Sequence, residues 1–244
     1  MSEATKNDRM IARQRERLFY FAMCLAIAIT VFAGFAKTFF LRPYFHPEPL
    51  VPLLILHGVI FTSWIVLLMV QTILIARRRV RLHRYLGVAG VVLAALVVLV
   101  GTTTAILRTD LNGPPGTPSP LTFLTIPLGD MLVFGILAGC AFWFRQRPDI
   151  HKRLIILATI AVLPAAVARL PLRFIFRINP LAFYAVTDLF MIPCLIYDFA
   201  TRGRPHRATV FGSLLLVVSQ PLRFVIGRTD AWLAFATWLV HQIR

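Results

Sequence analysis

The sequence predicts an all-α membrane protein, a polytopic bundle of about seven transmembrane helices with a short C-terminal interfacial helix. Two observations support this class. First, 58% of the 244 residues are hydrophobic, whereas soluble globular chains are typically about 45–50% apolar. Second, the mean hydropathy is +0.76, and the apolar residues gather in runs of the roughly 20 residues that a bilayer-crossing helix needs. Because no polar segment is long enough for a second domain, we expect a single membrane domain over residues 18–227.

Seven apolar runs meet the length that a span requires. The first run follows a polar, basic segment, residues 1–17, and is longer than the roughly 7–15 apolar residues of a cleaved signal peptide. It is therefore predicted to be retained as a span. Breaks between later runs carry helix-stopping residues such as Asn112-Gly113-Pro114-Pro115-Gly116 and Asn179-Pro180. The predicted spans cover residues 18–38, 50–76, 85–107, 120–144, 153–172, 180–199 and 208–227.

The C-terminal residues 228–244 contain an apolar stretch, 231–243, that is short for a span. Thr229 and Asp230 can cap a helix here, and Trp232 and Trp238 are typical of the membrane–water interface. We expect a helix that lies at the membrane surface. A partial eighth span is the alternative.

The distribution of Lys and Arg predicts the orientation. Residues 1–17 carry five of them, loop 77–84 five, loop 145–153 four and loop 200–207 three, and all four segments lie on one side of the predicted bundle. By the positive-inside rule this side is cytoplasmic. We therefore expect a protein of the bacterial inner membrane whose N-terminus lies in the cytoplasm. These loops can contact anionic lipid head groups. The net charge of +16 is spread over short loops, so nucleic acid is not an expected partner.

A weak internal repeat is visible in the basic loops. Three of them end in a histidine followed by a basic residue, where the returning helix begins. In addition, Pro171-Leu172-Arg173-Phe174 recurs as Pro221-Leu222-Arg223-Phe224. The pattern predicts three helical hairpins in the same orientation after one lone span, since parallel repeats are a known membrane architecture. The histidines are either interfacial residues or imidazoles offered to a cofactor or to lipid phosphates. The three motifs are His83-Arg84, His151-Lys152 and His206-Arg207.

Ionisable side chains inside predicted spans form the candidate binding pocket. Such groups cost about 2.5–3.5 kcal/mol in a span and therefore usually face the bundle interior. We expect Asp130 or Asp188 to pair with Arg169, in a pocket open to the outside whose surplus arginine favours an anionic ligand or lipid head group. The alternative is a buried ion-pair network that only fixes helix packing. The candidate pocket residues are His57, Asp130, Arg169, Arg173, Asp188, Gln220 and Arg223.

Motifs of known chemistry are absent from the sequence. It contains no phosphate-binding glycine loop, paired-cysteine metal site or nucleophile elbow, so no catalytic residue and no metal site are predicted. Cys24, Cys140 and Cys194 all lie within predicted spans and suggest no disulfide framework. The open function classes are transport, sensing or lipid and small-anion binding through the pocket, membrane redox chemistry, and a structural or assembly subunit of a membrane complex.

Two family resemblances add to these predictions. The pieces Leu56-His57-Gly58, Gln71-Thr72, Arg81-Leu82-His83-Arg84-Tyr85-Leu86-Gly87 and Arg147-Pro148-Asp149-Ile150-His151-Lys152-Arg153 resemble a family of uncharacterised bacterial seven-span membrane proteins. That resemblance covers roughly residues 50–207 and implies no established activity.

The His-Arg-x-Leu-Gly piece is also similar to membrane cytochromes of the b561 type, which implies haem b and transmembrane electron transfer. Among the histidines only His57 lies well within a span. Under this resemblance, haem could therefore be held only near the cytoplasmic surface, by two of His83, His151 and His206.

Overall fold

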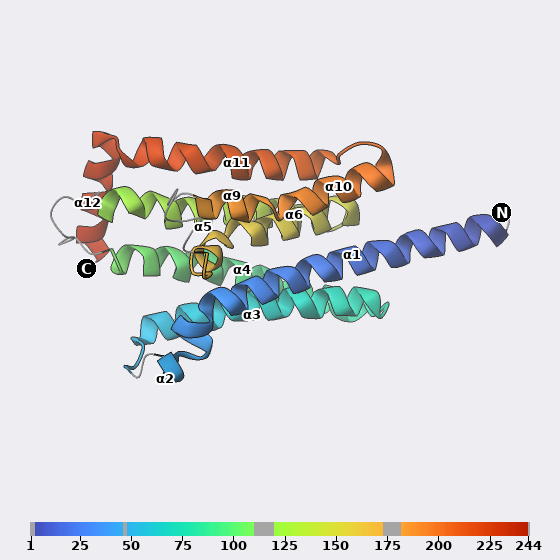
Figure 1. The fold of residues 1–244 in the computed structure, drawn as a ribbon, viewed down its shortest axis with the longest axis horizontal. Helices are drawn as coiled ribbons and strands as arrows, with labels where there is room; N and C mark the ends of the chain where they lie inside the picture. The colour runs from blue at the N-terminus through green and yellow to red at the C-terminus, as the bar shows by residue number, and fades with distance from the viewer. Residues whose placement is uncertain (1–2, 46–47, 110–119, 173–181, 244) are drawn as a thin grey trace.

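The computed structural model describes residues 3–45, 48–109, 120–172 and 182–243, and every regular element within these ranges is a helix (Figure 1). The all-α prediction is confirmed. The elements are α1 (Glu3–Phe35), η1 (Ala36–Phe40), α2 (Arg42–Phe45), α3 (Pro52–Ala76), α4 (Val80–Leu107), α5 (Pro120–Trp143), α6 (Pro148–Ala161), α7 (Pro164–Val167), α9 (Ala182–Asp188), α10 (Met191–Arg202), α11 (Arg207–Gly227) and α12 (Asp230–Ile243).

Within the described ranges, six helical segments are long and apolar enough to cross a membrane. They match all but the fifth of the predicted apolar runs, and their most hydrophobic windows are largely exposed on the bundle surface. Large apolar side chains such as Leu99, Leu132 and Val225 are more than 60% exposed. The segments are Met10–Phe40, Pro52–Ala76, Val80–Leu107, Pro120–Trp143, Ala182–Arg202 and Arg207–Gly227.

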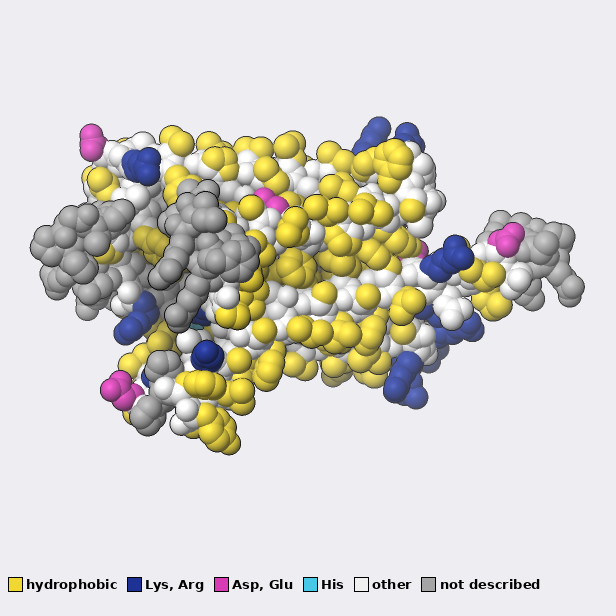
Figure 2. Space-filling view, viewed as in Figure 1, with side chains coloured by type: hydrophobic (Ala, Val, Ile, Leu, Met, Phe, Trp, Pro, Cys, Tyr) yellow, Lys and Arg dark blue, Asp and Glu magenta, His cyan; other side chains and the backbone are white. Residues whose placement is uncertain are grey.

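The surface of the molecule has the distribution of side chains expected of a membrane protein. Figure 2 shows hydrophobic side chains along the length of the bundle, with the visible Lys and Arg side chains gathered towards its two ends. A continuous apolar surface of this kind is not tolerated in water, because exposed apolar patches on soluble monomers rarely exceed a few hundred Å². This surface, together with the six long apolar helices among the described residues, indicates a membrane protein.

The fifth predicted run, 153–172, is a broken helix. Helix α6 ends at Ala161. The next turn is tighter than an α-helix, because Val162 N–H donates to Thr159 C=O (3.3 Å) and Leu163 N–H donates to Ile160 C=O (3.1 Å). The four-residue helix α7 then begins at Pro164. Proline causes the break because its ring clashes with the carbonyl of the preceding turn and it has no N–H to donate. The resulting pieces are too short to count among the six long apolar helices.

Helix α6 lies in the interior of the bundle. Its residues 156–161 are all buried, and it packs against α5, α11, α1 and α10. Along the rest of the bundle, α3 packs on α4, α4 on α5, and α5 on α11, whereas α1 lies against α3 and α7 (Figure 1). The short α6 is thus enclosed by α5, α11, α1 and α10.

The sixth predicted run, 180–199, also contains a break. Helix α9 ends at Asp188 and α10 begins at Met191. Pro193 has no N–H to offer the carbonyl of Leu189, so the helical hydrogen bonding is interrupted at this turn.

The two ends of the bundle differ in character. One end, here called the basic end, holds the turns between α3 and α4, between α5 and α6, and between α10 and α11. At the other end, here called the cavity end, α2 is found and α12 lies across the ends of α5 and α11 (Figure 1). Thr229 accepts a hydrogen bond from Trp232 N–H (3.2 Å) as the predicted cap of α12. The Trp232 indole donates to Leu121 C=O (2.8 Å) and so attaches α12 to α5.

The contact between α1 and α7 yields a test of the fold. At Gly34 an added Cβ would lie 2.3 Å from the carbonyl oxygen of Ala166. Because that neighbour is backbone, Gly34→Ala must push the helices apart, and we expect it to lower the free energy of unfolding by about 1–3 kcal/mol. Thermal unfolding in detergent measures the change. The matched control is Gly139→Ala in α5, where an added Cβ meets nothing within 4 Å; equal stability of the two variants would contradict the close approach.

Candidate functional site

A cavity of about 710 Å³ lies in the half of the bundle near the cavity end. Its walls come from α1 and η1, α3, α4, α5 and the α6–α7 segment. Its volume is within the roughly 300–1,000 Å³ of typical ligand pockets. Small residues in the walls, such as Gly101, Ala105, Ala165 and Ala166, leave this space open.

The lining residues differ in character with their position along the helices. Arg42 in α2, Arg108 directly after α4 and Arg169 after α7 are here called the mouth of the cavity. Phenylalanine rings form much of the middle, and Asp130, Trp64 and Thr159 lie at its floor. On α3 the lining runs from Leu54 to Ile65, which at about 1.5 Å per residue is about 16 Å along the axis. The cavity is therefore elongated, with polar groups at both ends. The phenylalanines are Phe35, Phe39, Phe40, Phe61 and Phe123.

The described contacts of two of the arginines at the mouth are with backbone carbonyls and an aromatic ring. Arg169 donates to Ala165 C=O in α7 (2.5 Å) and lies 4.8 Å from the centre of the Phe35 ring. Arg42 donates to the backbone carbonyl of Glu48 (3.0 Å). None of the three forms an ion pair with a described carboxylate. Within the part of the chain that the structure describes, their charge is therefore not neutralised by a carboxylate.

Of the predicted pocket residues, His57, Asp130 and Arg169 line this cavity together. The His57 ring stacks on Phe61 with 4.1 Å between ring centres. Its Nδ1 atom is buried and has no hydrogen-bond partner among the described residues. The positions of these three residues along their apolar runs already predict that they lie in the same half of the bundle. Arg173 lies outside the described residues.

The expected pairing of Arg169 with a buried carboxylate is not the one found. Asp130 forms its ion pair with Arg223, whose guanidinium also donates to the Tyr184 hydroxyl (2.9 Å) and to Ser219 Oγ (3.2 Å). Asp130 and Arg223 are 7% and 5% exposed. Arg169 lies past the break at Pro164, where it donates to Ala165 C=O and lies over the Phe35 ring.

Gly129 creates the space for this pair. A Cβ at Gly129 would lie 2.4 Å from Arg223 Nε, so any other residue would collide with the guanidinium. The absence of a side chain lets Arg223 cross the surface of α5 and reach Asp130 from behind the cavity wall. The second candidate carboxylate, Asp188, instead accepts a hydrogen bond from Gln220 Nε2 (2.7 Å). Neither Asp188 nor Gln220 lines the cavity.

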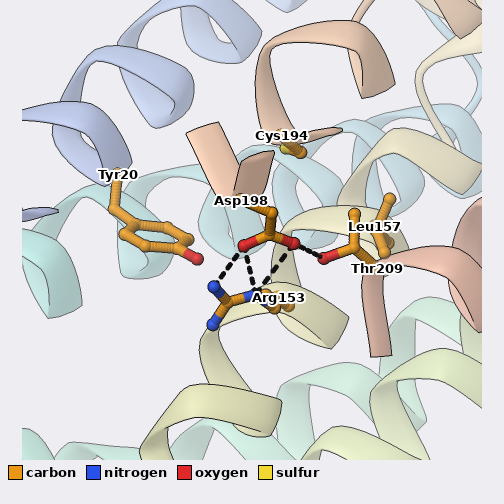
Figure 3. Close-up of a pocket in the computed structure, with 6 residues that line it drawn as sticks. All are labelled: Tyr20, Arg153, Leu157, Cys194, Asp198 and Thr209. Carbon is orange, nitrogen blue, oxygen red and sulfur yellow. Dashed lines mark hydrogen bonds and ion pairs between the residues drawn. The ribbon is translucent and has the colours of Figure 1, made fainter. Parts of the chain in front are cut away.

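A second buried ion pair lies towards the basic end, and the sequence analysis missed it. Arg153 donates to Asp198 through Nε (2.9 Å) and through a short Nη2 contact (Figure 3). The other Asp198 oxygen accepts from the Thr209 hydroxyl and from His206 N–H (3.1 Å). Arg153 was counted as a loop residue, and Asp198 was overlooked in the last turn of a predicted span. An aspartate in an apolar run was the available signal.

The Arg153–Asp198 group is a packing network. Figure 3 shows the two side chains enclosed by Tyr20, Leu157, Cys194 and Thr209. They are 5% and 1% exposed, and no water-sized space remains between them. Because every oxygen of Asp198 is hydrogen-bonded, the burial penalty of the pair is offset. The network joins α6 to α10 and α11.

The histidines of the basic loops have different surroundings. His206 Nδ1 accepts from Ala208 N–H (3.1 Å) and so caps α11, while Nε2 contacts Asp149 Oδ2 (3.1 Å). With both nitrogens engaged, His206 does not fit a haem ligand. His151 Nδ1 contacts Ala141 C=O (2.8 Å), and His83 Nδ1 is buried without a partner among the described residues. Haem ligation by His83 and His151 stays a prediction.

The basic neighbours of these histidines are mostly at the surface. Arg84 and Arg207 are exposed. Lys152 forms an ion pair with Glu16 (2.5 Å) and lies 5.2 Å from the centre of the Tyr20 ring, which attaches α6 to α1. Within the described residues, no group of three or more His, Cys, Asp and Glu side chains could hold a metal ion.

Comparison of the chain with protein-family models, with curated proteins and with solved structures finds no match. The resemblances to uncharacterised seven-span proteins and to b561-type cytochromes stay predictions. The function is therefore inferred from the geometry of the cavity and of its charged residues.

The His206 cap leads to a pH prediction. Burial lowers the pKa of His206, and the charge of Arg153 lowers it further, against the opposing effect of the Asp149 hydrogen bond. The ordinary pKa is about 6.5, so the unfolded chain binds more protons as the pH falls through this value. We expect the stability contributed by His206 to be complete above about pH 7 and to be lost as the pH falls from about 6.5 through the lower, folded pKa.

Thermal unfolding between about pH 7.5 and 5 measures this loss. His206→Asn is the matched variant, because asparagine caps helices without titrating in this range. Its stability should depend less on pH than that of the wild type. An identical pH dependence in both proteins would show that other groups are responsible.

Proposed function

We propose that this chain is a seven-span inner-membrane protein whose outward-facing cavity binds an anionic amphiphile. The observation that carries the proposal is the elongated cavity itself. It has three arginines without a described ion-pair partner at the mouth and aromatic walls below them.

The charge of the mouth favours an anion. Arg42, Arg108 and Arg169 together lack a described counter-charge, and guanidinium groups bind carboxylate and phosphate oxygens through paired N–H donors. Among the described lining residues, Asp130 is the carboxylate, and Arg223 already neutralises it. A cationic ligand would therefore meet net repulsion at the mouth.

The middle of the cavity favours an apolar chain. Five phenylalanines and several aliphatic side chains line it. A small inorganic anion would leave most of the 710 Å³ unfilled, whereas an alkyl chain would bury apolar surface at roughly 25 cal/mol per Å². An anionic head group at the mouth would meet the arginines, and an alkyl chain would then lie between the phenylalanine rings.

The floor of the cavity favours binding or sensing over an open channel. Beyond Trp64 and Thr159, whose side chains are hydrogen-bonded (3.2 Å), the interior is packed with buried residues such as Phe134, Leu137 and Leu157. The cavity therefore ends midway across the bundle. An open pathway to the basic end would require these helices to move apart.

In the proposed topology the α6–α7 segment, the fifth in chain order, brings the number of membrane segments to seven. The basic end faces the cytoplasm. The positive-inside rule supports this orientation, as the Arg77-Arg78-Arg79 turn and the other basic loops share that end. The hairpins α3–α4, α5–α6 and α10–α11 then have the same orientation. Helix α12 would lie in the outer interface, and the exposed Arg13 and Arg15 of α1 would contact anionic lipids.

Cysteine labelling tests the topology. We expect Glu48→Cys, between α2 and α3, to react with a membrane-impermeant maleimide on intact spheroplasts, since it would face outwards. Gln146→Cys, between α5 and α6, should react only after the membrane is permeabilised. Cys24 and Cys194 are buried, and the partly exposed Cys140 is replaced by alanine to remove background labelling. The opposite accessibilities would overturn the proposed orientation.

Tryptophan quenching tests the binding function. In lipid nanodiscs, 11-bromoundecanoate bound head-out should bring its bromine to the floor and quench Trp64. This part of the quenching should disappear in Trp64→Phe. Arg108→Gln with Arg169→Gln should weaken binding about tenfold or more, because hydrogen bonds to charged groups contribute about 1.5–3 kcal/mol.

The matched control removes the same charge from the basic end, with Arg77→Gln and Arg79→Gln. It should leave the dissociation constant unchanged apart from general electrostatic attraction to the protein. Equal weakening in the two double variants, or quenching that is unaffected in Trp64→Phe, would refute a ligand seated in this cavity.

A further inference from the structure

We infer that the ligand is a bipolar chain, with an anionic group at one end and a neutral hydrogen-bond donor, such as a hydroxyl, at the other. The inference rests on the proposed function and assigns Asp130 as the acceptor for the second polar group. It follows from the chemistry of the cavity floor, which differs from that of a pocket for a simple alkyl chain.

The polar groups at the two ends of the cavity are well separated. On α5 the lining begins at Pro120 and reaches Asp130 ten residues later, about 15 Å along the helix. On α4 the lining runs from Gly101 to Arg108, the arginine that directly follows the helix at the cavity end. A ligand that touches both ends must therefore be a chain with polar groups at its two termini.

Asp130 has hydrogen-bonding capacity left over. Its Oδ1 accepts from Arg223, and no hydrogen bond to Oδ2 is found among the described residues. A carboxylate has about four lone-pair positions, so one guanidinium N–H leaves acceptor sites open. Because Asp130 also lines the cavity, these sites can be reached by a bound molecule.

A methyl terminus would suit this floor poorly. It would remove water from the carboxylate without replacing the lost hydrogen bond, which is a costly outcome for a buried charged group. A hydroxyl would supply the missing donor. Thr159 is a weaker acceptor for this hydroxyl than the Asp130 carboxylate, because the Thr159 hydroxyl already accepts from Trp64 and donates to Ile155 C=O (2.9 Å).

The counter-charge of Asp130 excludes a cationic terminus. Arg223 already balances the carboxylate, so an ammonium group at the floor would add an uncompensated positive charge in a region of low dielectric. A neutral donor adds none. The ligand's only charge is then the anion at the arginine-lined mouth.

The floor is also held in place before any ligand binds. Arg223 is fixed by Tyr184 and Ser219 from α9 and α11, and by the close passage across Gly129. Asp130 is therefore restrained by its partner and does not have to be ordered during binding. Preorganisation of this kind increases selectivity for a ligand group of matching geometry.

The test compares dodecanoate with 12-hydroxydodecanoate as competitors of 11-bromoundecanoate in wild-type nanodiscs. Both concentrations are corrected for partition into empty nanodiscs. We expect the hydroxy acid to compete about tenfold more effectively, as is typical of one hydrogen bond to a charged group. A short pair, hexanoate and 6-hydroxyhexanoate, should show no such preference, since it cannot reach from mouth to floor.

The double variant Asp130→Asn with Arg223→Gln removes both charges and leaves no buried ion unpaired. It should lose the preference for the hydroxyl while still binding dodecanoate. Asp188→Asn, which changes a carboxylate outside the cavity, is the matched control and should keep the preference. The short-chain comparison needs only the wild type and therefore stands even where the double variant does not fold.

The outcomes separate the two proposals. Failure of either long acid to displace the probe would overturn the anionic-amphiphile function. Equal competition by both long acids in the wild type would leave that function standing and overturn the bipolar ligand. A preference that persists in the double variant, or that the short pair shares, would overturn the assignment to Asp130.

Discussion

Charged groups in the interior of this bundle have no water to solvate them, and the fold is organised around satisfying them. In hydrocarbon each unpaired polar group costs several kcal/mol. Among the described residues, two buried arginine–aspartate pairs meet this requirement, Arg223–Asp130 near the cavity and Arg153–Asp198 near the basic end. Each pair joins helices that are far apart in sequence, so each also fixes the packing of the spans.

The two pairs have different surroundings, and this difference separates a packing element from a candidate site. Asp198 is surrounded by Arg153, Thr209 and the His206 backbone, and no space is left beside it. Asp130 has one arginine behind it and a cavity in front. The first arrangement completes the solvation of the carboxylate within the protein. The second leaves part of that solvation to whatever occupies the cavity.

The broken helix in the centre connects these two regions. Helix α6 contributes Arg153 to the packed end and Thr159 to the cavity floor. It stops at Ala161 because Pro164 follows, and the chain beyond carries Arg169 to the mouth. Interrupted helices with polar groups near the break are a common way to build binding sites at membrane depth. Here the break separates the charge at the mouth from the charge at the floor.

The sequence alone determined the helical membrane class, the limits of most spans and the half of the bundle in which His57, Asp130 and Arg169 meet. These features follow from hydrophobic length and from a fixed rise per residue, which are local properties. The tertiary structure decided which arginine pairs with Asp130, because pairing depends on helix rotation and on the space that Gly129 leaves. It also decided that Asp198 is buried with Arg153 and that the fifth run breaks into two pieces around a cavity. Apolar runs of similar composition carry no record of which faces meet, since in lipid those faces are selected by packing and by polar contacts between helices.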